Sequence, residues 1–255
     1  MAVKIDIPTG MSDWVSYLEN TWLGSFGYDG HGSFSAYGAQ NYNYGQWVAG
    51  NVNTTQSAVL MDGDFSYAPP GGFSGDVDSL QFGDNLTGSS GSGYAIDTAL
   101  TLDLTEASAT SAYTYAIYYI SNYQDLSYLY NYLGEQGTEQ TGNSGGTDFL
   151  YSFSGDDILT GGGAGDYDFF VFDADYASTS TGWGDDTITD FIDGNDYISF
   201  NGYWSDYASF DADTTVTTSG TDTVISYTDS NSVTSTITLA NFSGTLNSSD
   251  FLFAA

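Results

Sequence analysis

The sequence predicts an α+β fold in which a curved antiparallel sheet covered by helices is followed by an all-β segment. Three observations indicate this order. Helical apolar spacing flanks a strand-like stretch in the first half, glycine and aspartate dominate residues 153–172, and short runs rich in Thr, Val, Ile and Tyr fill the rest. A polar, glycine-rich stretch separates the halves, so we expect domains at 1–138 and 148–255 joined by a linker at 139–147.

The first half contains three predicted helices and one clear strand. Residues 12–23 place apolar side chains on one face after Ser12, a residue type that favours the N-cap position. Two further helices are predicted at 111–123 and 125–133. Residues 94–105 alternate apolar and polar side chains, which is typical of a half-buried antiparallel strand. A sheet with helices over one face follows from this set of elements.

The segment 153–172, FSGDDILTGGGAGDYDFFVF, is typical of a parallel β-roll built on glycine- and aspartate-rich nonapeptides that wind around calcium. Asp157, Asp166 and Asp168 supply the hard oxygen ligands that calcium prefers. One residue interrupts the period before Asp168, so we expect one calcium site and exclude a full array. The alternative is an Asp-Gly turn in an acidic protein, and Asp186 is likewise either a further calcium ligand or a turn residue.

The remainder of the second half is predicted to be all strand. Within the roll, Leu159 and Phe170 are expected to point inward. After it, runs of β-favouring residues are separated by Asn, Asp, Gly and Ser turns, and these runs lie at 186–191, 196–200, 221–228 and 232–242.

The charge balance excludes several classes of function. The chain has 33 acidic residues, no cysteine, one histidine and a single lysine or arginine, giving a net charge of −32. Binding to nucleic acids or to anionic membranes requires Lys and Arg, and a Cys/His zinc site requires residues that this chain lacks. No apolar run is long enough for membrane insertion. Self-repulsion of this size favours saline, calcium-bearing surroundings.

The two ends of the chain bear on where the protein functions. The first ten residues, MAVKIDIPTG, lack the apolar core of a cleavable signal peptide. The last seven, SDFLFAA, are acidic and then apolar. Together with the roll, this ending resembles the carboxy-terminal address of proteins exported by type I secretion, which implies a secreted, extracellular protein.

Residues 148–255 resemble the C-terminal domain of serralysin-type metalloproteases. The motifs that carry the resemblance are GDDILTGG, FFVFDAD, GDDTITDF, DGNDYISF and SSDFLF, in the family's order. The resemblance implies a calcium-loaded, RTX-like roll with a β-sandwich extension, used for type I secretion and for folding outside the cell. No H-E-x-x-H motif is present, so the protease itself is absent.

Residues 11–134 resemble the secreted haem-binding hemophores of the HasA type. The motifs are WVSYLENTWLGSFGYDGHGSF, FSY, VDSLQFGDNLTG and AIYYISNYQDLSYLYNYLGEQG. In that family a loop histidine and a tyrosine bind iron from opposite faces of the haem, and by motif these residues are His31 and Tyr67.

One departure from the hemophore pattern concerns the proton of Tyr67. The family has a second histidine after the tyrosine, whereas this chain reads APPGGFSGD there. A free phenol has a pKa near 10, so its deprotonation needs a cause. Ferric iron can favour it unaided. The alternative is that a nearby carboxylate, such as Asp62 or Asp64, accepts the phenolic proton.

The leading hypothesis is an extracellular haem carrier that is not an enzyme. It would bind ferric haem b and calcium, leave the propionates toward solvent, and have an outer-membrane haem receptor as a candidate partner. The competing hypothesis is a secreted, calcium-dependent structural protein, such as a matrix, surface-layer or filament subunit. Such a subunit would self-assemble, with or without bound haem. A hydrolase with paired carboxylates is a third class, but no such pair stands out in the sequence.

Overall fold

The computed structural model describes residues 2–69, 72–163, 165–178 and 180–254. The chain divides into two compact units, of which the first comprises 1–4 and 14–132 and the second 5–13 and 133–255. The N-terminal segment therefore contributes to both units. The segment 139–147, which we expected as a linker, begins within strand β7 (Thr138–Thr141) of the second unit.

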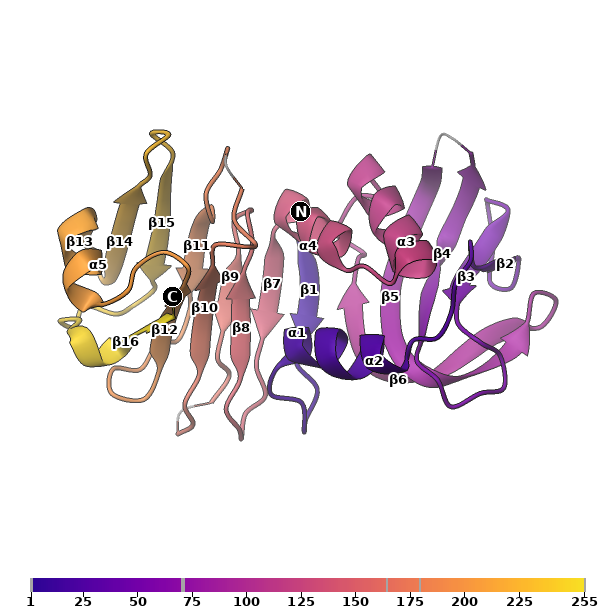
Figure 1. Ribbon diagram of the computed structural model, residues 1–255, viewed down its shortest axis with the longest axis horizontal. Coiled ribbons are helices and arrows are strands. Elements are labelled where there is room, and N and C mark those ends of the chain that lie inside the picture. Colours follow the sequence, from indigo (N-terminus) through magenta and orange to yellow (C-terminus); the bar gives the residue numbers. More distant parts are fainter. Residues whose placement is uncertain (1, 70–71, 164, 179, 255) are drawn as a thin grey trace. The chain divides into compact units, whose positions relative to one another are not determined.

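The first unit contains a curved antiparallel sheet (Figure 1). The predicted strand at 94–105 is confirmed as β6, and register shifts at Asp62/Gly63 and Phe82/Gly83 bend the long strands beside it. Lys4 of β1 (Val3–Asp6) pairs with Asp103 of β6. The other strands follow in the order β6 (Gly93–Asp103), β5 (Gly72–Ser89), β4 (Ala58–Ala68), β3 (Tyr44–Ala49) and β2 (Ser33–Ser35).

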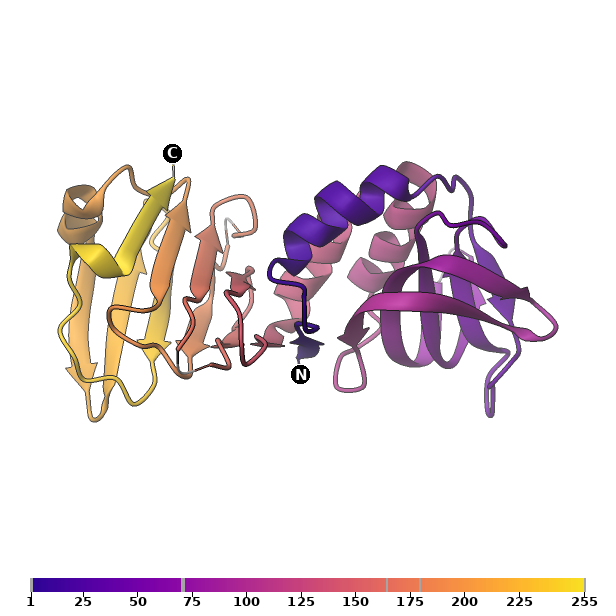
Figure 2. The same ribbon diagram turned by 90° about the horizontal axis from the view of Figure 1, so that it is seen from below.

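Helices cover one face of this sheet, as Figure 2 shows. The helix predicted at 111–123 is confirmed as α3 (Ser111–Tyr123), whose N-cap Thr110 accepts a hydrogen bond from the Tyr113 N–H. The helix predicted at 125–133 is α4 (Ser127–Gln136), which continues past Gly134 and ends before Gly137. The structure thus contains the helix-covered antiparallel sheet that the sequence predicts for the first half.

The first helical segment differs from a regular α-helix. It begins two residues after Ser12, and its middle is a π-helix, so that α1 (Trp14–Ser16) and α2 (Leu23–Ser25) flank η1 (Tyr17–Trp22). Leu18 and Trp22 are both fully buried on it. The Trp22 Nε1–H donates to the Ala58 carbonyl at 3.0 Å and so fixes this helix on β4.

The core of the first unit is aromatic. Tyr113 of α3 is fully buried and donates its hydroxyl hydrogen to the Met61 sulfur of β4 at 2.7 Å. Full burial of a large side chain stabilises a fold by about 1.5–3 kcal/mol. The fully buried large side chains of this unit are Trp14, Trp22, Trp47, Tyr113, Tyr132, Phe65 and Phe82.

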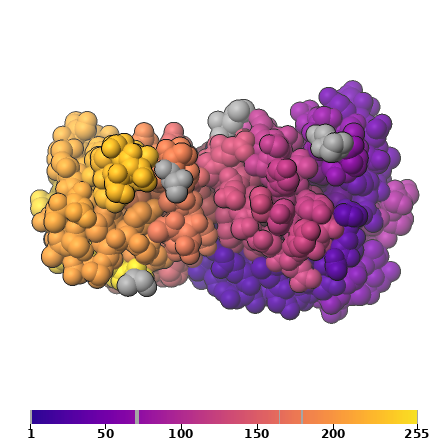
Figure 3. Space-filling model, turned by 45° about the horizontal axis from the view of Figure 1, so that its top comes forward, coloured from indigo at the N-terminus to yellow at the C-terminus, as the bar shows by residue number. Residues whose placement is uncertain are grey.

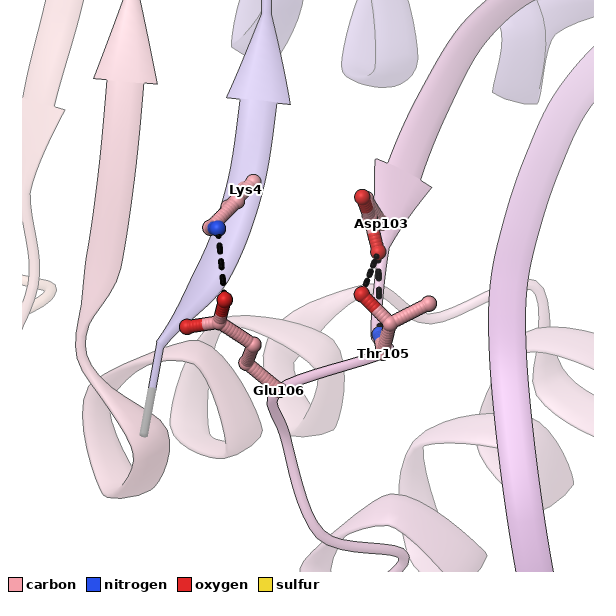
Figure 4. A network of polar contacts seen from close by, with 4 residues as sticks. All are labelled: Lys4, Asp103, Thr105 and Glu106. Carbon is pink, nitrogen blue, oxygen red and sulfur yellow. Dashed lines mark hydrogen bonds and ion pairs between the residues drawn. The ribbon is translucent and has the colours of Figure 1, made fainter.

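Lys4, the single lysine or arginine of the chain, is paired at the surface. Its Nζ lies 2.8 Å from Glu106 Oε1, and Asp103 nearby accepts hydrogen bonds from the Thr105 N–H and hydroxyl (Figure 4). Both side chains of the ion pair are exposed, so it adds at most about 1 kcal/mol.

The strands of the second unit belong to two sheets, and successive strands from β7 to β12 alternate between them. One sheet has parallel strands β7, β9 (Ile158–Thr160), β11 (Asp185–Ile188) and β15 (Thr234–Leu239), extended by antiparallel β14 (Asp222–Thr228) and β13 (Thr214–Ser219). The other is parallel throughout, with β8 (Phe149–Ser152), β10 (Phe169–Asp173), β12 (Tyr197–Asn201) and β16 (Phe251–Ala254).

The expectation of strands alone after the roll is wrong. The helix α5 (Tyr207–Asp213) interrupts them, because the Asp206 side chain caps it by accepting from the Ser209 N–H at 2.8 Å. A 3₁₀ turn, η2 (Ser248–Asp250), precedes the last strand. The predicted inward positions Leu159 and Phe170 are confirmed, since neither is exposed. None of the helices in the described ranges is long and apolar enough to cross a bilayer.

Candidate functional site

A cavity of about 400 Å³ opens in the first unit, and both predicted iron ligands line it. Its size falls within the range of small-molecule sites, and its surface is mostly apolar. The lining residues are His31, Phe34, Trp47, Tyr67, Pro69, Phe73, Thr114, Ile117, Tyr118, Ser121 and Asn122.

The loop that carries His31 is fixed through its backbone. The Gly30 N–H donates to the Ser121 carbonyl of α3 at 3.1 Å, and the Trp47 Nε1–H donates to the His31 carbonyl at 3.1 Å. Gly32 has a φ of +76°, and a Cβ atom there would collide with the Trp47 indole. The loop therefore holds its position while the exposed imidazole stays free to bind a ligand at the cavity wall.

Tyr67 lies near the end of β4, opposite Phe73 of β5. Its half-buried ring lies 5.4 Å from the Phe34 ring at 21° and 5.0 Å from the Phe73 ring, measured between centroids. In the described part of the chain, neither the Tyr67 hydroxyl nor the His31 ring nitrogens have a hydrogen-bond partner. Both candidate ligands therefore present unengaged donor atoms beside one apolar cavity.

The two carboxylates that we considered for the Tyr67 proton are engaged elsewhere. Asp62 accepts from the side-chain amides of Gln46 and Gln81, at 2.9 and 2.7 Å. Asp64 accepts from the backbone N–H groups of residues 40, 41 and 42. Among the described residues, neither carboxylate accepts a hydrogen bond from the Tyr67 phenol.

Sequence reasoning missed the wall of the cavity that α3 forms. Thr114, Ile117, Tyr118 and Ser121 lie at the i, i+3, i+4 and i+7 positions of one helix face, a spacing that the predicted helix already contained. The Tyr118 ring lies 6.1 Å from the His31 imidazole at 18°. The outer faces of α3 and α4 form the rose-coloured surface in Figure 3.

Tyr118 stays protonated at neutral pH. Hydrogen bonding with Tyr123 is the largest cause that raises the pKa of Tyr118, and the nearby Tyr67 adds a smaller contribution. The Tyr118 phenol therefore faces the cavity as a neutral group.

Two of the four predicted calcium ligands, Asp157 and Asp186, lie together in the second unit. The Asp157 N–H donates to Asp186 Oδ1 at 2.8 Å, and both side chains are 1% exposed. The Asp157 carboxylate itself accepts from Thr138 and from the Phe153 N–H. Burial raises the pKa of Asp157 to about 7 and that of Asp186 well above its usual range.

The other two, Asp166 and Asp168, lie beside Asp148. Asp168 accepts from the Asp148 N–H at 3.0 Å and Asp166 from the Gly146 N–H at 3.2 Å. Burial is the largest cause that raises the pKa of Asp168 to about 7, and neighbouring carboxylates add to it. In residues 2–69, 72–163, 165–178 and 180–254, no three His, Asp or Glu side chains are arranged as a metal-binding group.

Comparison with known families identifies the class of the chain. Residues 55–255 match the family described as Peptidase M10 serralysin C terminal. The match covers most of the sequence, and the chain belongs to this family. It extends further toward the N-terminus than the segment 148–255 whose motifs predicted it.

Structures of the hemophore HasA from Yersinia pestis are among the similar solved structures. The hexagonal apo form has a TM-score of 0.39 and 19% identity, covering 52% of this chain and 88% of that one. The holo form has a TM-score of 0.31 and 24% identity, covering 40% and 65%. No curated protein matches the sequence. Because these similarities are low, ligand binding has to be inferred from the pocket itself.

Proposed function

We propose that the chain is a secreted haem-binding protein that carries ferric haem b and is not an enzyme. The observation that supports this most is the common placement of His31 and Tyr67. Both line one mostly apolar cavity of about 400 Å³, and the donor atoms of both are unengaged among the described residues. Imidazole and phenolate are established ligands of haem iron.

The residues of the cavity fit a haem group. Phe34, Trp47 and Phe73 offer apolar rings to a porphyrin, and α3 adds further polar side chains to those of the two proposed ligands. When bound, ferric haem would supply a Lewis-acidic iron that coordinates nitrogen and oxygen donors. His31 would offer a neutral imidazole nitrogen, and Tyr67 would offer its oxygen after losing the phenolic proton.

The environment of Tyr67 indicates what removes that proton. The carboxylates of Asp62 and Asp64 already accept hydrogen bonds from other groups, and Tyr118 is itself protonated and so is not a base for this proton. Of the causes considered for deprotonation, this leaves the positive charge of a bound ferric ion, which would favour the phenolate form of Tyr67. The propionates would lie toward solvent, because Lys4 pairs with Glu106 and the chain has no arginine.

A hemin titration tests this function. The apo-protein should develop a Soret band that saturates at one equivalent. His31→Ala and Tyr67→Phe should each shift the band, because each removes one of the two proposed iron ligands. Tyr37→Phe is the matched control, since Tyr37 is 62% exposed and does not line the cavity. A band that never saturates, or identical spectra for all four proteins, would exclude the proposed site.

Export and calcium binding are the second part of the proposal. Membership of the serralysin C-terminal family favours type I secretion. Alternation of parallel strands between two sheets suits a β-roll, and Asp157, Asp166, Asp168 and Asp186 are its candidate calcium ligands. Calcium would compensate the negative charge of Asp157 and Asp168, whose pKa values are raised mainly by burial and further by neighbouring carboxylates.

A further inference from the structure

An aspartate precedes each of the four parallel strands of the sheet formed by β8, β10, β12 and β16. The register places the first three of these aspartates side by side. The Asp148 N–H donates to Asp168 Oδ1 at 3.0 Å, and the Asp168 N–H donates to Asp196 Oδ1 at 3.2 Å. Asp168 and Asp196 thus each accept a hydrogen bond from the backbone beside the preceding strand of the sheet, whereas Asp148 at the start of the row accepts from the Asn143 N–H.

The fourth aspartate, Asp250, does not continue the row. β16 pairs with β12 one residue out of step, so that Asp250 lies opposite Tyr197 and not opposite Asp196. The N–H groups of Asp196 and of Tyr197, the first residue of β12, donate elsewhere, to the carbonyls of Ile192 and Asp168. Asp250 therefore lacks the cross-strand backbone donor that Asp168 and Asp196 have.

One oxygen of Asp250 is left without a partner as a result. Its Oδ2 atom accepts from the Asn247 N–H of its own turn at 2.6 Å. Its Oδ1 atom is buried and has no hydrogen-bond partner within the described residues, and the side chain is 1% exposed. A buried, unpaired carboxylate oxygen is costly unless a cation or a proton compensates it.

The neighbour of the Asp250 side chain is a second carboxylate, that of Asp193. Asp193 lies in the turn before β12, and Asp250 lies in the turn before β16, so that parallel pairing brings both turns to the same end of the sheet. Burial and the adjacent Asp193 carboxylate both raise the pKa of Asp250. Two carboxylates can hydrogen-bond to each other only if one of them keeps a proton.

No side chain of the second unit can neutralise this pair. The chain has one lysine, no arginine and one histidine, and these two cationic residues, Lys4 and His31, both belong to the first unit. Compensation therefore has to come from solution, as a proton or as a bound cation.

We propose that Asp193 and Asp250 bind a hard divalent cation, for which calcium is the probe, where β12 and β16 begin. Carboxylate oxygens are the ligands that calcium prefers. Asp193 is exposed, which provides a path of entry and leaves coordination positions for water. The bound cation would link the start of β16 to the turn before β12 and so stabilise the pairing of these two strands. This site is separate from the four candidate ligands of the roll and does not depend on haem.

Calcium stoichiometry of the full-length protein tests the site. Wild type should bind one more calcium ion per chain than Asp193→Asn. The calcium-dependent rise in melting temperature should be smaller in that variant by roughly 3 °C. Asp193→Lys places an ammonium group beside Asp250, so it should raise the melting temperature in chelator. Asp175→Asn, at another exposed acidic residue of the same unit, should behave like wild type.

Two results would overturn the proposal. Equal calcium stoichiometry in wild type and Asp193→Asn would show that the two carboxylates share a proton instead of a metal ion. An equal loss of calcium in Asp175→Asn would show that the effect comes from net charge and not from this pair. Neither result would bear on hemin binding, which involves the other unit.

Discussion

Gly32 is the residue on which the position of His31 depends most directly. Its φ of +76° and the Trp47 ring next to it leave no room for a side chain. Gly32→Ala should therefore weaken hemin binding about tenfold or more, which corresponds to roughly 1.4 kcal/mol. The measurement is a hemin titration followed at the Soret band.

Gly38→Ala is the matched control for this prediction. Gly38 also has a positive φ, +86°, but no atom would lie within 4 Å of the added Cβ. Both variants should lose about 1–2 kcal/mol of stability through the backbone, and only Gly32→Ala should also lose hemin affinity. Equal hemin affinities in the two variants would contradict the role assigned to the loop.

The two proposed iron ligands differ in how far the sequence alone could indicate them. His31 is the one histidine of the chain, whereas Tyr67 is one of 22 tyrosines and needed the hemophore resemblance. Trp47 and Tyr118 had no comparable signal, since an aromatic residue on a strand or helix is most often a core residue. Their place at the cavity depends on how β3 and α3 meet, which no single residue specifies.

At the scale of the strands, the buried carboxylates between β7, β9 and β11 predict an unusual pH dependence. Burial raises the pKa of Asp157 from 3.8 to about 7, although hydrogen bonds from Thr138 and Phe153 lower it. The folded state then binds more protons than the unfolded state between pH 4 and 7. In chelator, stability should be highest near pH 4 and fall as the pH rises through about 7, as a melting series would show.

Asp186→Asn tests the origin of that slope. The amide oxygen can still accept from the Asp157 N–H, and the Ser152 hydroxyl can reorient to accept from the new amide. Removing the buried charge should raise the melting temperature at pH 7 in chelator and leave it unchanged at pH 4, where the carboxyl of the wild type is protonated. A lower melting temperature at pH 7 would show that the charged form is already compensated in the folded protein.

The predictability of the elements follows from their local signals. The helix at 111–123 combines a capping threonine with the helical spacing of apolar residues, and both features are present in α3. The helix α5 has only one turn of apolar residues, and Asp206 could equally begin a turn. The strand β13 consists mostly of exposed residues and has no alternation of buried and exposed side chains. It forms a strand because its backbone pairs with β14, which its own sequence does not indicate.

At the scale of the whole molecule, the net charge of −32 predicts that salt stabilises the protein. The screening length falls from about 30 Å at 0.01 M to about 3 Å at 1 M ionic strength. The melting temperature should therefore rise with sodium chloride, and hemin affinity should rise with it because the propionates are repelled less. A melting temperature that falls between these salt concentrations would contradict the dominance of self-repulsion.

The division into two units was only partly visible in the sequence. Composition places the division at 139–147, whereas the second unit begins at residue 133, and nothing in the first fourteen residues indicates that 5–13 belongs to the second unit. That assignment rests on backbone pairing, such as the Phe149 N–H donating to the Ser12 carbonyl at 2.8 Å. Contacts between residues far apart in sequence leave no local pattern.

A crystal structure of the protein with bound hemin tests the central claim most directly. The account predicts iron bound by a ring nitrogen of His31 on one face of the porphyrin and by the Tyr67 oxygen on the other, within the cavity walled by α3 and β5. A haem bound at any other place, or an iron bound by neither residue, would contradict it.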